Sequence, residues 1–174
     1  MTNCTSSQEV IDAIREMGAV RIGIDGKDGT GKSTLAQEIS AALGLHCISL
    51  DTFLEKGKDR YVEYIDYPKL KATLENHEGY VVEGVCLRQV LQRIQLVPEA
   101  NIYIKRMRHD YWLNEDTLDI NEPVESVVAR ELQDANMFSS SPIANLPLAE
   151  EVIRYHDEFR PHNHADVTYA LSVR

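Results

Sequence analysis

The chain has 174 residues, of which 43% are hydrophobic and 26% are charged, and its formal net charge is −10. This length suits one domain with a substantial core, and no unbroken apolar run approaches the length of a membrane span. The acidic excess disfavours a nucleic acid as the main partner, because a phosphate backbone would be repelled over most of the surface. The first ten residues also lack the basic start and the apolar block of a secretion signal. We therefore expect a single-domain cytoplasmic protein without a membrane or nucleic-acid partner, whose oligomeric state the sequence does not indicate.

Apolar patterns predict helices and strands in alternation along the chain. Residues 10–17 have helical spacing after a capping box formed by Ser6 and Glu9. Residues 20–24 predict a short buried strand, and an apolar helical stripe begins at Leu35 and ends at Gly44. Further strands are predicted at residues 46–50, 80–82, 101–104 and 167–173, and further helices at residues 70–75, 87–94, 124–132 and 148–159. Such alternation is typical of a mostly parallel sheet covered by helices on both faces.

The three cysteines form no Cys-x-x-Cys pair. Cys47 and Cys86 lie among apolar neighbours, where a thiol most often behaves as a small hydrophobic side chain. We therefore expect both to be buried and without a chemical role.

The segment GKDGTGKS fits the pattern G-x-x-x-x-G-K-[ST] at every fixed position, with a predicted strand before it and a helix after it. Its glycines allow successive backbone N–H groups to turn inward and form an anion cradle at a helix N-terminus. In this pattern the lysine neutralises charge on the β- and γ-phosphates, and the serine hydroxyl binds Mg²⁺. The sequence thus predicts a site for ATP and Mg²⁺ formed by residues Gly26, Asp28, Gly29, Thr30, Gly31, Lys32, Ser33 and Thr34.

Two carboxylates, Asp51 and Glu83, end separate predicted strands. In a parallel sheet both can project from the edge that carries the phosphate loop. There one carboxylate would hold Mg²⁺ or its water shell, and the other would accept a proton from an attacking hydroxyl. The alternative for each is a helix cap or a surface charge after a strand.

A basic segment follows the fourth predicted strand, with Lys105, Arg106 and Arg108 close together. Arg106 and Arg108 on a closing segment would neutralise charge on the phosphoryl group that is transferred and would exclude water. The alternative is a solvated basic face, which is the common reason for a run of charges.

The segments "GIDGKDGTGKST", "ISLDTF", "YVVEGV" and "HDEFRPHNHADV" resemble, in this order, the uridine kinase-like branch of the P-loop kinases. This branch also includes phosphoribulokinase, pantothenate kinase and nicotinamide riboside kinase. The resemblance implies a three-layer α/β P-loop NTPase fold with a five-stranded parallel sheet and a small helical lid, for which residues 105–121 are the candidate. It also implies transfer of the γ-phosphate of ATP to a hydroxyl of a nucleoside or nucleoside-like metabolite.

By position, the resemblance makes Asp51 the base that activates the acceptor hydroxyl and places Glu83 at the Mg²⁺ site with Ser33. The segment "YIDYPKL" resembles the family's Asp-His-Pro acceptor segment, which would place Asp66 near the hydroxyls of the acceptor. Tyr67 stands where uridine kinases have histidine, and residues 68–79 are fewer than in the acceptor region of those enzymes. A uridine acceptor is therefore not specified.

Two other classes of protein use the same loop. A nucleotide-switch GTPase would carry an Asn-Lys-x-Asp guanine reader after a strand, and this sequence has none. A nucleotide-binding regulator would keep the loop but would need no base, so Asp51 and Glu83 favour an enzyme over it.

Overall fold

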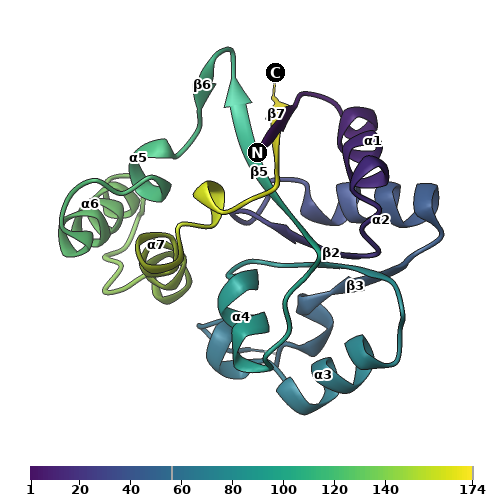
Figure 1. The fold of residues 1–174 in the computed structure, drawn as a ribbon. Helices are drawn as coiled ribbons and strands as arrows, with labels where there is room; N and C mark the ends of the chain where they lie inside the picture. Colours follow the sequence, from purple (N-terminus) through teal and green to yellow (C-terminus); the bar gives the residue numbers. More distant parts are fainter. Residues whose placement is uncertain (56, 174) are drawn as a thin grey trace.

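A computed structural model describes residues 1–55 and 57–173, which form a seven-stranded sheet with helices on both faces (Figure 1). The strand order is β1-β7-β5-β2-β4-β3, and β6 pairs with the free end of β5. Every pair is parallel except β5 with β6. The strands are β1 (Thr2–Cys4), β2 (Arg21–Asp25), β3 (His46–Ser49), β4 (Tyr80–Glu83), β5 (Ala100–Arg108), β6 (Tyr111–Trp112) and β7 (Val167–Ser172).

The expected five-stranded sheet is wrong in its number of strands. The five predicted strands are all present and adjacent, in the order β7-β5-β2-β4-β3, and all are parallel. The two further strands are β1, which has three residues and pairs with β7, and β6, which has two residues and forms a hairpin with β5. Strands of two or three residues are too short to show a period of their own in the sequence.

The helices form two layers, one on each face of the sheet (Figure 1). Helices α1 and α2 share one hydrophobic core with the sheet, and α3, α4 and α7 share the other. Alternation along β5 divides the side chains, since Ile102 and Ile104 enter the first core and Tyr103 enters the second. The helices are α1 (Ser7–Met17), α2 (Lys32–Leu43), α3 (Tyr67–Glu75), α4 (Leu87–Arg93), α5 (Glu115–Leu118), α6 (Val124–Met137) and α7 (Pro147–Phe159), with 3₁₀ turns η1 (Leu50–Phe53), η2 (Val62–Tyr64) and η3 (Pro161–Asn163).

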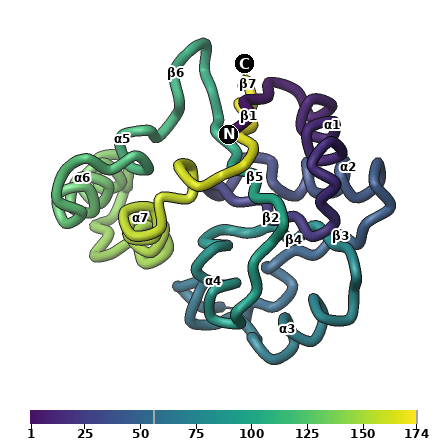
Figure 2. Tube along the Cα trace, in the orientation of Figure 1, coloured from purple at the N-terminus to yellow at the C-terminus, as the bar shows by residue number. Residues whose placement is uncertain are grey.

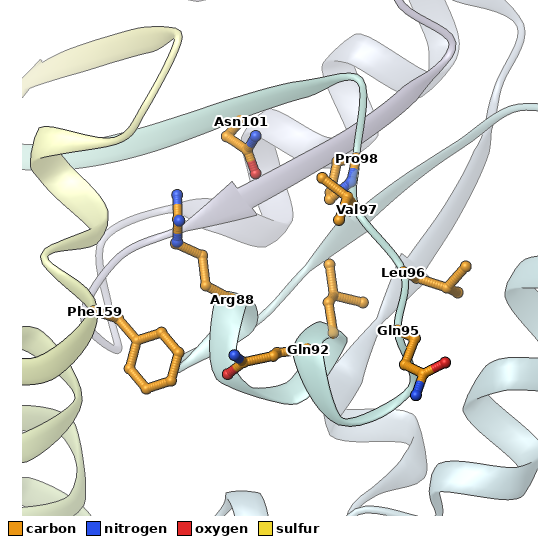
Figure 3. Close-up of a pocket in the computed structure, with 9 residues that line it drawn as sticks. Arg88, Gln92, Gln95, Leu96, Val97, Pro98, Asn101 and Phe159 are labelled. Atoms are coloured by element: carbon orange, nitrogen blue, oxygen red, sulfur yellow. The ribbon is translucent and has the colours of Figure 1, made fainter.

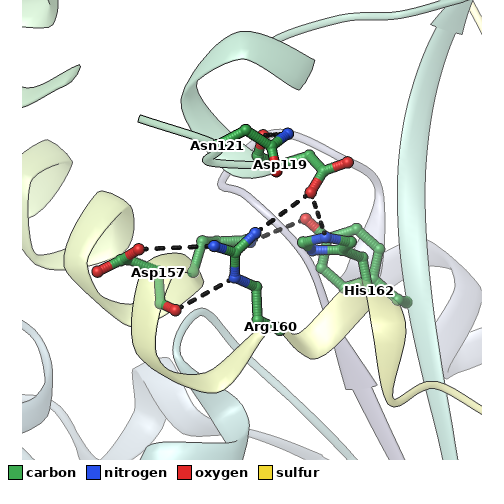
Figure 4. A network of polar contacts seen from close by, with 7 residues as sticks. Asp119, Asn121, Asp157, Arg160 and His162 are labelled. Carbon is green, nitrogen blue, oxygen red and sulfur yellow. Dashed lines mark hydrogen bonds and ion pairs between the residues drawn. The ribbon is translucent and has the colours of Figure 1, made fainter. Parts of the chain in front are cut away.

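Residues 105–121, the predicted lid segment, contain one short helix. They extend β5, return as β6 and end in the four-residue helix α5. The end of this segment is held against the region after α7, because Asp119 Oδ1 lies 3.4 Å from Arg160 Nη1 and 3.3 Å from His162 Nε2 (Figure 4). The conformation of this segment is determined by its pairing in the sheet and by these polar contacts. Neither produces a periodic apolar pattern in the sequence from which it could be predicted.

The first and last segments of the chain lie side by side at one edge of the sheet (Figure 2). In the described parts of the chain, no helix has both the length and the apolar character needed to cross a membrane. Cys86 is buried as expected, but the prediction for Cys47 is wrong, because this residue is exposed on the edge strand β3.

Candidate functional site

The phosphate loop joins β2 to α2, as the sequence predicted, and its glycines have backbone angles that other residues rarely adopt. The φ angles are 152° at Gly26, 67° at Gly29 and 86° at Gly31. A Cβ atom on Gly26 would lie 3.1 Å from the carbonyl oxygen of Ile104 on the neighbouring strand. The loop therefore needs glycine both for its turn and for its close approach to β5.

Lys32 begins α2 and is almost fully buried, with 7% of its surface exposed. Its Nζ donates a hydrogen bond to the Lys27 carbonyl at 2.7 Å, so the ammonium group reaches back across the loop. Burial lowers the pKa of Lys32, while Asp25, Glu83 and other nearby carboxylates act in the opposite direction. A buried cation that reaches across a glycine loop at a helix N-terminus fits a bound phosphate chain.

Ser33 and Glu83 are brought together from α2 and from the end of β4. The hydroxyl of Ser33 donates to Glu83 Oε1 at 3.1 Å, and Glu83 is 3% exposed. A hydroxyl and a carboxylate oxygen at this separation fit a Mg²⁺ ion that takes its remaining ligands from phosphates and water. Among the described residues no cluster of three or more His, Cys, Asp and Glu side chains could hold a metal ion by itself.

Asp51 lies in η1, directly after β3, and is held by a partner that the sequence analysis missed. The Tyr61 hydroxyl donates to Asp51 Oδ1 at 2.6 Å. Burial and the neighbouring Asp51 carboxylate raise the pKa of Tyr61, so its hydroxyl keeps its proton and remains a donor. The segment around Tyr61 is fixed in turn by Glu151 on α7, which accepts from the Tyr61 N–H at 2.6 Å and from the Val62 N–H at 3.1 Å.

One cleft of about 680 Å³ brings together most of the predicted site residues. Asp51, Tyr61, Glu83 and Leu148 line it together with residues of the loop. Asp28 contributes a carboxylate that would repel phosphate, so any contact to a phosphate would come from its backbone N–H. The predicted residues in the cleft are Asp28, Gly29, Gly31, Lys32, Ser33, Thr34, Asp51 and Glu83.

The remaining predicted residues lie outside this cleft. Arg106 lines a second cavity of about 230 Å³ on the other side of the loop, and its Nη1 lies 3.9 Å from the position of a Cβ on Gly29. Arg108 is exposed at the end of β5, opposite Tyr111 of β6. Asp66 caps α3 by accepting from the Lys69 N–H at 3.1 Å. Of these residues, Arg106 lines a cavity beside the loop, and Asp66 does not line the cleft.

Sequence reasoning also missed Asp25, the last residue of β2. Its Oδ1 accepts from the Gly26 N–H at 2.7 Å, and its Oδ2 accepts from the Tyr155 hydroxyl on α7. Burial raises the pKa of Asp25 to about 6, against the opposing effects of these hydrogen bonds and of Lys32. The sequence does contain a signal for Asp25, namely a carboxylate at the end of a buried strand and directly before the loop. It contains none for Tyr155, which has the same helical spacing as the apolar core residues around it.

The parallel sheet and the glycine loop between β2 and α2 have the geometry of a P-loop nucleotide-binding protein. No family model matches the chain. Among curated proteins, a cytidylate kinase from Thermoplasma volcanium is 26% identical over 140 residues, which cover 68% of this chain and 72% of the relative.

Three solved structures show a likeness to the chain. A possible uridine kinase from Bacillus stearothermophilus is 19% identical with a TM-score of 0.48, covering 93% of this chain and 98% of that one. Shikimate kinase from Aquifex aeolicus is 13% identical with a TM-score of 0.40, covering 86% of each chain. Shikimate kinase from Bacteroides thetaiotaomicron is 14% identical with a TM-score of 0.43, covering 87% of this chain and 86% of that one.

Proposed function

We propose that the protein is an ATP-dependent kinase that transfers the γ-phosphate to a hydroxyl of a small uncharged acceptor such as a nucleoside. The observation that carries this proposal is the shared cleft, in which Lys32 and the Ser33–Glu83 pair lie together with the Asp51–Tyr61 pair. The similarity to a cytidylate kinase supports phosphoryl transfer as the reaction class.

The loop residues would hold the triphosphate through backbone N–H groups and through the Lys32 ammonium. Ser33 and Glu83 would hold Mg²⁺, which when bound with ATP neutralises the negative charge of the phosphates. Arg106 lies against the loop from the β5 side, where it would add positive charge near the nucleotide. Positioning and charge neutralisation are the main contributions that a protein makes to this type of reaction.

Asp51 would act as the general base for the acceptor hydroxyl. It already accepts one hydrogen bond from Tyr61, so its orientation is fixed before an acceptor binds. The attack on the phosphoryl group makes the hydroxyl proton acidic, and a carboxylate within hydrogen-bond reach accepts it.

The charges of the cleft favour an acceptor without a phosphate or carboxylate group. The lining residues include three carboxylates, on Asp28, Asp51 and Glu83, and one cation, Lys32, which the triphosphate would use. An anionic acceptor would leave its charge close to Asp51 without a compensating side chain among these lining residues. The second candidate, transfer to the phosphate of a nucleoside monophosphate, is favoured by the similarity to cytidylate kinase.

The test is ADP release from Mg·ATP with matched acceptor pairs, namely cytidine with cytidine monophosphate and uridine with uridine monophosphate. Pantothenate and sugar phosphates extend the panel. We expect the uncharged acceptor of a pair to stimulate ADP release, and we expect this stimulation to be lost in the Asp51→Asn variant. Stimulation by a monophosphate alone would establish the second candidate. ADP release that no acceptor stimulates, and that Asp51→Asn leaves unchanged, would refute the kinase proposal and favour a nucleotide-binding regulator. Tighter binding of GTP than of ATP would favour a switch.

A further inference from the structure

Another cavity, of about 500 Å³, lies away from the phosphate loop, between α4, the end of α7 and the start of β5 (Figure 3). It shares no lining residue with the cleft that holds Lys32 and Asp51. Its volume is in the range of small-molecule sites in proteins. The proposed reaction therefore gives this cavity no role.

The charged group of the cavity is Arg88, in the first turn of α4. In Figure 3 its side chain rises from α4 towards the level of Asn101, with the Phe159 ring beside it. Within residues 1–55 and 57–173, its guanidinium group has no ion-pair partner and no hydrogen-bond partner. None of the described residues that line the cavity has a carboxylate side chain, although the chain has 28 acidic residues against 18 basic ones. An unpaired guanidinium group in so acidic a protein is available to an anion from outside the chain.

Arg88 is also anchored through its backbone. Its N–H donates to the Tyr155 hydroxyl at 3.3 Å, and that hydroxyl donates to the buried Asp25. The backbone of Arg88 is therefore held in place at the cavity.

The other lining residues define the rest of a ligand. The amide side chains of Gln92, Gln95 and Asn101 offer both donors and acceptors. Leu91 and Phe159 supply apolar surface, and the Phe159 ring is stacked on Tyr155 with its centroid 5.2 Å away. A ligand that uses all of these groups has an anionic end, an apolar or aromatic body and room for polar substituents.

We propose that this cavity is a second binding site, specific for a small organic anion that carries a carboxylate or phosphate monoester on an apolar or aromatic body. Arg88 binds the anionic group, and Leu91 and Phe159 contact the body. The site is independent of the proposed kinase reaction, because it shares no lining residue with the phosphate cleft.

The experiment uses 2-naphthoate as the probe and the uncharged 2-naphthamide as its matched control. Titration into the ¹⁵N-labelled protein, followed by amide chemical shifts, measures affinity and location together. We expect 2-naphthoate to bind about tenfold more tightly than 2-naphthamide, with the shifts centred on Arg88, Asn101 and Phe159. Shifts centred on the phosphate loop, or equal affinity for the two probes, would overturn the proposal, as would no binding of 2-naphthoate.

Two variants test the assigned contacts. Arg88→Gln keeps a polar side chain but removes the charge, so it should abolish the preference for 2-naphthoate. Arg15→Gln removes the same charge from exposed α1 and should keep the preference. Phe159→Ala should lower the affinity for both probes by a similar factor, because it removes a contact with the aromatic body that both share and not with the carboxylate group. A preference for 2-naphthoate that survives in a folded Arg88→Gln variant would refute the role of Arg88.

Discussion

The hydroxyl of Tyr155 on α7 donates a hydrogen bond to the carboxylate of Asp25 at the end of β2, 130 positions earlier in the chain. The other oxygen of Asp25 accepts the N–H of Gly26, the first residue of the phosphate loop. This contact connects α7 to the first residue of the phosphate loop. The same helix supplies Glu151, which holds the backbone of Tyr61 near Asp51.

Buried Asp25 and His156 have opposite effects on the pH dependence of stability. Burial raises the pKa of Asp25 to about 6, so its contribution to stability is full below about pH 4 and is lost as the pH rises to about 6. Burial lowers the pKa of His156 to about 4, so its contribution is full above about pH 6.5 and is lost as the pH falls to about 4. Each contribution amounts to about 3 kcal/mol, and over this window they largely cancel.

Asp25→Asn should reveal the contribution of His156. We expect its free energy of unfolding to fall, relative to that of the wild type, by about 3 kcal/mol between pH 6.5 and pH 4. Chemical denaturation at half-unit pH steps measures this difference. The matched variant His156→Gln should show the opposite trend, with stability that rises as the pH falls. Variant profiles parallel to that of the wild type would contradict the assigned effects.

Tyr61→Phe should reduce the rate of the proposed phosphoryl transfer through the orientation of Asp51. Loss of one hydrogen bond to a carboxylate predicts a fall in kcat of roughly tenfold with little change in the KM for ATP. Asp51→Asn should cost more, on the order of a hundredfold or above, because it removes the base. Steady-state kinetics of both variants give the comparison. Equal kcat in Tyr61→Phe and the wild type would show that Asp51 needs no positioning by the tyrosine.

Lys32→Ala should weaken the binding of Mg·ATP and Mg·ADP, roughly tenfold or more, because the ammonium group is the single cation among the described residues that line the phosphate cleft. Lys27→Ala is the matched control in the same loop. Its side chain lines the two neighbouring cavities, and its structural contact to Lys32 is made by the carbonyl group, which alanine keeps. Calorimetric titration distinguishes the two variants. Similar losses in both would show that overall loop charge, and not the position of Lys32, determines affinity.

Gly84→Ala should destabilise the fold by about 1–3 kcal/mol, because a Cβ atom there would lie 2.7 Å from Leu50 Cδ1 and 2.8 Å from Leu50 Cβ. Thermal or urea denaturation measures the change. Leu50→Ala is itself destabilising, since Leu50 is fully buried, but it removes part of the overlap. The double variant should therefore lose less stability than the two single variants together. Additive losses would place the strain elsewhere.

A large part of this fold could be predicted from local patterns in the sequence. The phosphate loop and the five main strands were predictable, because glycine spacing and buried apolar runs are properties of a few consecutive residues. Placing Asp51 and Glu83 at one sheet edge also followed from the sequence, since parallel strands end on the same side. The added strands β1 and β6 were not predictable, because two or three residues are too few to show an alternating apolar pattern.

The sequence alone determined that this chain has a phosphate loop on a parallel α/β sheet, with carboxylates at the strand ends beside it. Only the tertiary structure decided which distant side chains support these groups. Tyr61 holds Asp51, Tyr155 holds Asp25, and Arg88 faces a separate cavity without an ion-pair partner among the described residues. The physical reason is that a motif fixes the backbone over a few residues. The partners of a buried polar group, in contrast, depend on how helices from other parts of the chain pack against it.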